Sequence, residues 1–398
     1  MTFVQGLMGF LSSWKFVVVF YIIVAIIIYI YRKKFQVESG FILLYRTNWG
    51  IKFIDKFAEK HKEFLKIVGY TAIGIGFIGM FTICALLLKG LYELIFVPSA
   101  PPTLSLVIPG VQIPGSPIFI PFWYGIIALF IVVVFHEFGH GIIARSHGLK
   151  IKNTGFGFFG PLPLAFVEPD EKQIVKQGSV VQHSIFAAGP FFNVLLVGII
   201  MLIALFVVNP LISTMVTPQG VVFGSIQDGY PAAQYGLEKG VPYDTMNGAH
   251  ITDTTALATA FSCVKPNETI KIGNENKTVM LVTTANPNDA TKGYIGVSSI
   301  KTNYVLKNQE WWYKGIYYLL FMLSTLLDWI MTLSLGIGLA NLLPLGPVDG
   351  GRMLNKAAID INGKKKGTKI WATISIMTLV VMAILIFVPI IKSVLFKA

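Results

Sequence analysis

The feature that most constrains this chain is a long apolar stretch, from Leu94 to Phe135, that contains no charged side chain. A helix that crosses a lipid bilayer needs about 20 mainly apolar residues, and this stretch is long enough to supply one. The stretch leads directly into the sequence His-Glu-Phe-Gly-His at residues 136–140. Because ionisable side chains are costly in lipid, their presence at the end of a span indicates a functional site rather than chance packing.

The composition of the whole chain is typical of membrane proteins. Hydrophobic residues make up 54% of its 398 residues and charged residues only 13%, whereas globular chains carry about 25% charged residues. The formal net charge is +12. Because the charges flank apolar stretches, orientation in a bilayer explains them better than a nucleic-acid partner does.

We predict a polytopic α-helical membrane protein with about six transmembrane helices. The expected spans cover roughly residues 10–31, 67–88, 121–140, 184–208, 317–345 and 370–391. The first of these is read as a retained span and not as a cleaved signal peptide, since a basic leading region and a small-residue cleavage site are both missing. Six spans would place both ends of the chain on the same side of the membrane.

The charges of the connecting segments predict the orientation. Lys and Arg outnumber Asp and Glu by nine to four in residues 32–66, by five to three in 145–176 and by six to one in 352–369. The longer segment 209–314 carries eight of each. Basic loops stay in the cytoplasm, so the three basic segments are expected inside and 209–314 outside. Both ends of the chain would then lie outside, and the histidine pair would lie at the cytoplasmic end of the third span.

The histidine pair has the spacing of a metal site. On a helix, His136 and His140 are four residues apart and share one face, so both imidazoles can bind one ion, with Glu137 beside them to handle a proton. A catalytic zinc site takes three protein ligands and leaves a fourth position for water. Asp349 is the best candidate for the third ligand, because it follows the fifth span on the expected cytoplasmic side. The alternative is that Asp349 is an ordinary turn residue before Gly350.

Two further segments are expected to form β-structure. Residues 155–167 are apolar but rich in Gly and Pro, which favours a membrane-associated β-ribbon or a re-entrant loop over a helix. Residues 216–302 contain strand-like pieces at 220–226, 269–272 and 279–283, separated by turn residues. Around Pro231–Leu237 and Asn247-Gly248 this segment resembles a PDZ domain, although Gly240-Val241 replaces the usual Gly-Asp. The alternative is a small β-rich spacer.

Three motifs in order resemble the site-2 protease family of intramembrane metalloproteases. They are His-Glu-Phe-Gly-His at 136–140, Ala-Gly-Pro-Phe-Phe-Asn at 188–193 and Asn-Leu-Leu-Pro-Leu-Gly-Pro-Val-Asp-Gly-Gly at 341–351. The resemblance covers about residues 120–355. It implies that His136, His140 and Asp349 bind one Zn²⁺, that Glu137 is the general base, and that Asn193 and Asn341 line the substrate site. The alternative for the two asparagines is that they satisfy backbone groups near Pro190 and Pro344.

The predicted organisation has five parts. They are an N-terminal membrane region with two spans and a basic cytoplasmic loop (1–120), a first catalytic membrane part (121–210), an inserted small PDZ-like extramembrane domain (216–302), a second catalytic membrane part (303–355) and a basic loop with the last span (356–398).

The expected function is hydrolysis of peptide bonds within or near the transmembrane segments of membrane proteins. The expected partners are such a substrate and the lipid bilayer, and a peptide that binds the PDZ-like domain is a further candidate. The main alternative is a non-catalytic protein that binds membrane proteins through the PDZ-like domain. A second alternative is a prenyl-protein protease, which also uses two histidines four residues apart. Such an enzyme usually takes its third metal ligand from a later glutamate, and no glutamate follows Glu310, so this alternative is disfavoured. A transporter is disfavoured because the polar groups gather at one end of the spans.

Overall fold

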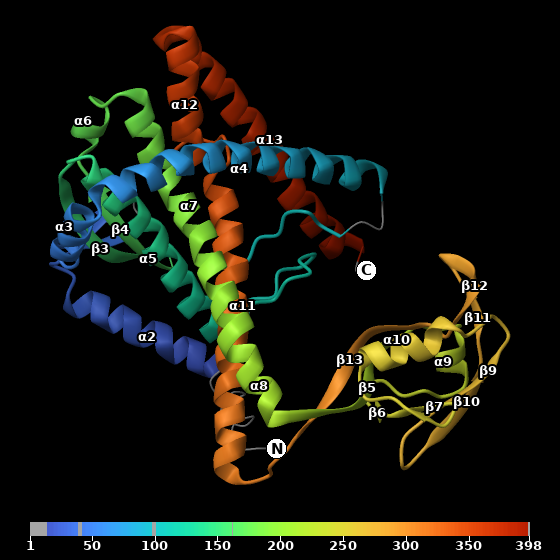
Figure 1. Ribbon diagram of the computed structural model, residues 1–398. Helices are drawn as coiled ribbons and strands as arrows, with labels where there is room; N and C mark the ends of the chain where they lie inside the picture. Colours follow the sequence, from blue (N-terminus) through green and yellow to red (C-terminus); the bar gives the residue numbers. More distant parts are fainter. Residues whose placement is uncertain (1–13, 39–41, 98–100, 161, 397–398) are drawn as a thin grey trace. The chain divides into compact units, whose positions relative to one another are not determined.

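Five helices of the described chain are long and apolar enough to cross a membrane. The computed structural model describes residues 14–38, 42–97, 101–160 and 162–396 (Figure 1). The five are α4 (Lys62–Phe96), α5 (Phe122–Ser146), the continuous helical stretch Ser179–Met215, α11 (Trp311–Asn341) and α13 (Lys364–Phe396). Within Ser179–Met215, α7 (Ser179–Ile203) passes through one π-helical turn, η1 (Ala204–Val208), into α8 (Asn209–Met215).

The first of the six expected spans coincides with a shorter helix. It falls on α2 (Trp14–Ile30), which has 17 residues and is apolar apart from Lys15, while residues 10–13 lie outside the described chain. Six spans therefore remain a prediction. The third span differs from the expectation in one respect: α5 continues to Ser146, so residues 136–140 lie inside the helix and not at its end.

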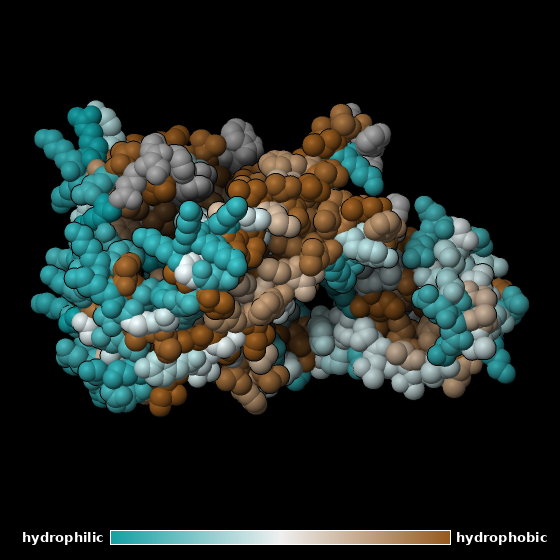
Figure 2. All heavy atoms as spheres, turned by 90° about the horizontal axis from the view of Figure 1, so that it is seen from above, coloured by the Kyte–Doolittle hydropathy of each residue, from teal (hydrophilic) through white to brown (hydrophobic). Residues whose placement is uncertain are grey.

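The surfaces of these helices suit lipid better than water. Only 11% of the most apolar window of α13 is buried inside the protein, and large apolar side chains such as Phe81 on α4 are 74% exposed. In Figure 2 apolar side chains gather over the middle of the helical part, and hydrophilic ones gather on the side where Figure 1 places α3 and α6. An apolar surface of this extent on a folded chain indicates a membrane or a partner.

The described chain divides into two compact units. The helical unit comprises the described residues up to Leu205 and from Met322 onward, and the second unit comprises Phe206–Phe321. In the helical unit α7 packs against α4, α5 and α12 (Asp349–Asn362), and these helices share one core. Glycines allow the close approach: a Cβ atom at Gly139 of α5 would lie 2.7 Å from the Phe192 ring of α7.

A four-stranded antiparallel sheet completes the helical unit. Its strand order is β1 (Phe35–Glu38), β2 (Ile42–Thr47), β3 (Ile151–Phe159) and β4 (Leu162–Pro169). The β3–β4 pair confirms the ribbon interpretation of residues 155–167 and rejects the re-entrant loop. The sheet also includes two strands from the basic segment 32–66, which the sequence did not predict. β4 is an edge strand, and no described strand pairs with its outer side.

Two short helices flank the sheet. The amphipathic helix α3 (Ile51–Lys60) packs against α5 and β3. After β4, the Asp170 side chain accepts a hydrogen bond from the Lys172 amide and caps α6 (Glu171–Ile174). A side-chain hydrogen bond from Lys152, which also forms an ion pair with Asp170 (3.1 Å), holds the pKa of that carboxyl below its usual value.

The second unit is β-rich with its own hydrophobic core. The strands expected at 220–226 and 269–272 are confirmed as parts of β5 (Val216–Ile226) and β9 (Thr269–Gly273), and the strand expected at 279–283 corresponds to β10 (Thr278–Val282), which ends one residue earlier. Asn247 and Gly248 have φ angles of 52° and 81° and form the expected turn. The other elements are α9 (Pro231–Gln234), β6 (Pro242–Tyr243), β7 (Thr245–Met246), β8 (Ala249–His250), α10 (Thr254–Ser262), β11 (Thr284–Asn286), β12 (Asp289–Tyr294) and β13 (Val297–Leu306). The PDZ assignment of this unit stays a prediction.

Candidate metal centre

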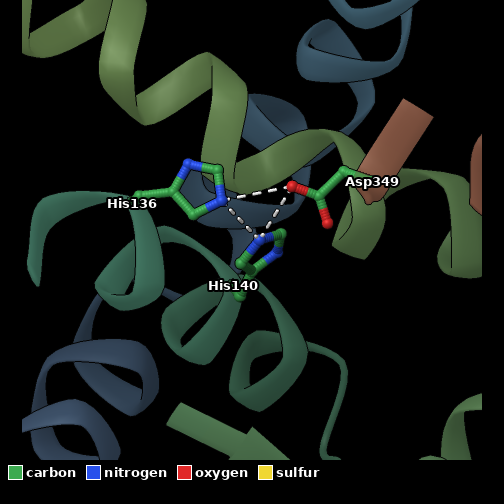
Figure 3. A group of neighbouring side chains, drawn as sticks. All are labelled: His136, His140 and Asp349. Carbon is green, nitrogen blue, oxygen red and sulfur yellow. Dashed lines mark hydrogen bonds and ion pairs between the residues drawn. The ribbon is translucent and has the colours of Figure 1, made fainter. Parts of the chain in front are cut away.

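The side chains of His136, His140 and Asp349 converge on one point (Figure 3). Asp349 Oδ2 lies 3.2 Å from His136 Nε2 and 3.3 Å from His140 Nε2, and the two Nε2 atoms are 3.2 Å apart. Among the described residues, this is the one cluster of three or more His, Cys, Asp or Glu side chains with metal-ligand spacing. The structure therefore brings together the two histidines of the His-Glu-Phe-Gly-His motif and the predicted aspartate, which lies more than 200 residues later in the chain.

The spacing of the three donor atoms fits a tetrahedral metal ion. Zinc binds nitrogen and oxygen ligands at about 2.0–2.2 Å, and the ligand atoms of a tetrahedron of that size are about 3.3–3.6 Å apart. The observed separations are 3.2 and 3.3 Å. Two imidazole lone pairs and a carboxylate oxygen so close to one another, and 13% exposed or less, favour a cation among them.

Space for an ion exists because α7 presents a glycine to the histidines. A Cβ atom at Gly189 would lie 2.5 Å from His136 Nε2 and still closer to His140 Nε2. Any side chain at this position would therefore occupy the place where the three donor atoms meet. Gly189 belongs to the second motif, Ala-Gly-Pro-Phe-Phe-Asn, so part of that motif serves to leave the centre open.

The end of α11 and the start of α12 deliver Asp349. The helix α11 ends at Asn341, and α12 begins at Asp349. The turn between them is tight: a Cβ atom at Gly350 or Gly351 would overlap the Leu342 or Leu345 carbonyl oxygen. The two glycines therefore allow the chain to turn closely after α11 and bring Asp349 to the histidines. As the first residue of α12, Asp349 also lies at the positive end of the helix dipole.

The charges around Asp349 favour its ionised form. Burial alone would raise the pKa of this carboxyl, but without a metal ion the protonated imidazoles of His140 and His136 outweigh burial and hold the pKa below its usual range. A carboxylate that stays charged at neutral pH is the form that binds a metal ion.

A backbone carbonyl orients His140. His140 Nδ1 lies 2.8 Å from the carbonyl oxygen of Ile185 on α7, so Nδ1 carries the proton and donates it. The lone pair of the ring then belongs to Nε2, which faces the other two ligands. This is the tautomer that a metal-binding histidine needs.

Asn193 performs the matching role for His136. Its Nδ2 lies 3.2 Å from His136 Nδ1, while its Oδ1 is buried without a hydrogen-bond partner among the described residues. An amide rotated by 180° would place Oδ1 against Nδ1–H, which satisfies the buried oxygen and leaves the Nε2 lone pair for a metal. Ser334 on α11 donates to the Asn193 carbonyl (2.9 Å) and joins the two helices at this point.

This position of Asn193 differs from the sequence-based expectation. Asn193 is fully buried behind His136 and does not line the cavity at the metal centre, whereas Asn341 does line it. The cavity has a volume of about 330 Å³ and also exposes Glu137, Glu168, Glu171 and Arg352. Asn341 lies on the wall of the cavity, where its Nδ2 also donates to the Ile337 carbonyl (3.1 Å), and Asn193 lies against His136.

Glu137 lies between the metal centre and the sheet. Its Oε2 accepts a hydrogen bond from the backbone amide of Val167 on β4 (3.2 Å), and its side chain lines the cavity that the three donor atoms share. This contact fixes the carboxylate beside the centre without making it a ligand. The sequence could not reveal this contact, because the contact joins α5 to the edge strand β4.

The sequence also did not indicate an ion pair at the rim of the cavity. Arg352 on α12 donates to both carboxylate oxygens of Glu171 (2.7 and 2.9 Å), and its guanidinium lies 4.1 Å from the centre of the Phe186 ring. Such paired contacts give Arg352 a fixed orientation. Two other histidines lie outside the metal cluster: His147 contacts Ser184 Oγ (3.3 Å) and His183 contacts the Ser179 carbonyl (2.7 Å).

Comparisons with known proteins identify relatives of this chain. The model of a family described as Peptidase family M50 matches residues 124–385, which contain all the candidate site residues. An uncharacterised protein of Methanocaldococcus jannaschii is 29% identical over 355 residues, which cover 87% of this chain and 86% of that relative.

Proposed function

Because the chain belongs to peptidase family M50, we propose that it is a zinc metalloprotease that hydrolyses peptide bonds within or near transmembrane segments of membrane proteins. Membership of the family implies a metalloprotease, and the five long apolar helices imply an integral membrane protein. The proposal adds the metal, the roles of the residues and the class of substrate.

One observation carries the proposal. Two imidazole nitrogens and one carboxylate oxygen meet at 3.2–3.3 Å beside a second, non-coordinating carboxylate, within a cavity of about 330 Å³. Three protein ligands with an open fourth position are typical of catalytic zinc, whereas structural zinc usually takes four protein ligands. The arrangement therefore supports catalysis over the alternative of a non-catalytic binding protein.

The residues of the chain divide the work of hydrolysis. The bound zinc would lower the pKa of a water molecule and polarise the substrate carbonyl. Glu137 accepts the proton of the attacking water and later donates it to the nitrogen of the leaving amine. The Val167 amide keeps Glu137 in place, and Asn341 can donate a hydrogen bond to the substrate from the wall of the cavity.

The edge of β4 supplies partners for an unwound substrate. The Val167 amide points away from β3, because it donates to Glu137. Since backbone groups alternate along a strand, the Ala165 amide points the same way, and the next outward position is Pro163, which has no amide proton. A transmembrane helix must break its own hydrogen bonds before cleavage, and strand addition to this edge would replace them.

The charge distribution supports an orientation for the protein. We infer that the metal centre faces the cytoplasmic side, with residues 216–302 and both ends of this chain on the outer side. The connecting segments 32–66, 145–176 and 352–369 are basic, and 209–314 is balanced. Substrates would be membrane proteins that share the bilayer with the enzyme.

Cleavage of a defined substrate tests the proposed function. The purified full chain in lipid vesicles would be incubated with a peptide that contains one transmembrane helix, and the products would be identified by mass spectrometry. We expect cleavage within or near the helix, its loss on removal of metal by a chelator and its recovery with zinc. An intact peptide in the presence of zinc, with several helix sequences tried, would contradict the proposal.

A further inference from the structure

A second, larger cavity adjoins the metal centre. It has a volume of about 700 Å³ and lies among α3, α5 and the sheet. Its lining is aromatic and aliphatic, and its aromatic side chains include Trp49, Phe53, Phe57, Phe138 and Phe156. It shares Glu137 and Val167 with the cavity at the metal centre, so the two cavities meet at the candidate general base.

The cavity lies on the face of the sheet that packs toward α5. A Cβ atom at Gly141 of α5 would lie 3.0 Å from Val167 Cγ1, which shows that the Val167 side chain points toward this helix. Phe156 is the cross-strand partner of Ala165, and its ring lies 5.7 Å from that of Phe130 on α5. Because side chains two apart share a face, Ala165 and Val167 both point to the α5 side.

We propose that this cavity is a specificity subsite that receives a large apolar side chain of the substrate. The substrate residue that carries this side chain lies opposite Ala165, two positions from the substrate residue opposite Val167. This inference rests on the proposed function and on strand addition to β4. Residues directly opposite each other in neighbouring strands place their side chains on the same face of a sheet. The substrate residue opposite Val167 would lie beside Glu137, and the residue opposite Ala165 would place its side chain in the cavity.

The lining indicates which side chains the subsite accepts. Apart from Glu137 at one end, Lys52 is the charged residue among the lining residues that the structure describes, and the remainder are mostly aromatic or aliphatic. A charged substrate side chain would lose its hydration there without gaining a fixed partner. Phenylalanine, leucine or tryptophan would bury apolar area against the rings.

The size of the cavity agrees with a side chain and the backbone that carries it. A volume of about 700 Å³ lies in the range of roughly 300–1,000 Å³ that is typical of small-molecule sites. The smallest side chain of the lining, apart from glycine, is that of Ala165, which is 9% exposed. A larger residue at position 165 would therefore reduce the space directly opposite the incoming side chain.

A substitution scan of the substrate tests the position. In a peptide cleaved by the full chain in vesicles, each residue within four of the cleaved bond would be replaced in turn by Ala, Phe and Asp. Hydrophobic pockets discriminate by about 10- to 200-fold between side chains of different size. We expect one substrate position, the one opposite Ala165, to show at least a tenfold preference in kcat/KM for Phe over Ala. The two neighbouring substrate positions should show no such preference.

Variants of the enzyme test the cavity itself. Ala165→Leu should reverse the preference so that Ala is cleaved faster than Phe, whereas Leu164→Phe, a matched change on the opposite face of β4, should leave the preference unchanged. Phe57→Ala, which enlarges the cavity from α3, should shift the preference toward Trp and keeps the test decisive if Ala165→Leu does not fold. Zinc content would be measured for each variant.

The outcomes separate this inference from the proposed function. Cleavage without any dependence on the side chain, or with a dependence that the variants do not alter, would overturn the subsite and leave the protease intact. Rates that follow the acyl-chain length of the vesicle lipid but not the substrate residue would assign the cavity to lipid and overturn it as well. A wild-type chain that holds zinc but cleaves no peptide would instead refute the proposed function.

Discussion

The backbone amide of Val167 donates a hydrogen bond to the carboxylate of Glu137 over 3.2 Å. This contact joins an edge strand to the residue that we propose as general base. A substrate strand that pairs with β4 would therefore have its backbone aligned with the carboxylate from the moment it binds. Fixed positions of this kind contribute to catalysis because the reacting groups need no further ordering.

The two asparagines of the predicted site should separate in their effects. Asn193→Ala removes the partner of His136 Nδ1 and should weaken zinc binding by about 10- to 100-fold, the usual effect of losing an outer hydrogen-bond partner of a metal ligand. Asn341→Ala should retain zinc and lower the rate of cleavage. Equilibrium zinc titration and peptide cleavage would be measured for both variants, and equal zinc affinities would refute the assignment of Asn193.

Gly189 should tolerate no side chain. Gly189→Ala places a methyl group between the two histidines and should reduce zinc occupancy severely. Gly198→Ala on the same helix is the matched control, because a Cβ atom there meets no other atom within 4 Å. Metal content per chain distinguishes the two variants. Full zinc occupancy in Gly189→Ala would show that the ion binds elsewhere in the protein.

The edge of β4 should be sensitive to the loss of one amide. Ala165→Pro removes an outward donor and should lower cleavage while zinc content stays the same, since proline lacks the N–H group that strand addition requires. The naturally occurring Pro163, two residues away, shows that the edge accommodates proline. Unchanged cleavage by Ala165→Pro would show that strand addition to this edge does not hold the substrate.

The orientation can be tested without activity. Single cysteines placed near Lys365 should react with impermeant reagents from the cytoplasmic side, and cysteines near Asn276 should react from the outside, because basic loops stay in the cytoplasm. The natural Cys84 and Cys263, both without a disulfide partner, would first be replaced by serine. Reversed labelling would place the metal centre on the other face of the membrane.

The sequence singled out the three residues that the structure brings together, because chemistry and topology constrained them jointly. The spacing of His136 and His140 is a property of one helix, and Asp349 follows a span that was predicted to end on the same side of the membrane as the histidine pair. The β3–β4 pair was also predictable, since its strands are adjacent in the chain and rich in residues that disfavour a helix. In each case the signal was local or followed from counting spans.

The remaining features depend on long-range packing that no local pattern encodes. Strand β2 (Ile42–Thr47) pairs with β3 although more than 100 residues separate them, so the sheet was predicted with two strands instead of four. The contact of Asn193 with His136 depends on the rotation of α7 against α5. The pair of Arg352 with Glu171 joins α12 to the short helix α6. Contacts of this kind follow only from the assembled helices.

The most direct test of the account separates metal binding from proton transfer. Zinc content and peptide cleavage would be measured side by side for the wild-type chain, Glu137→Gln and Asp349→Ala. We predict about one zinc per chain and full cleavage for the wild type, about one zinc per chain without cleavage for Glu137→Gln, and a loss of both zinc and cleavage for Asp349→Ala. An Asp349→Ala variant that keeps its zinc and its activity, or a Glu137→Gln variant that cleaves at the wild-type rate, would contradict the proposed centre.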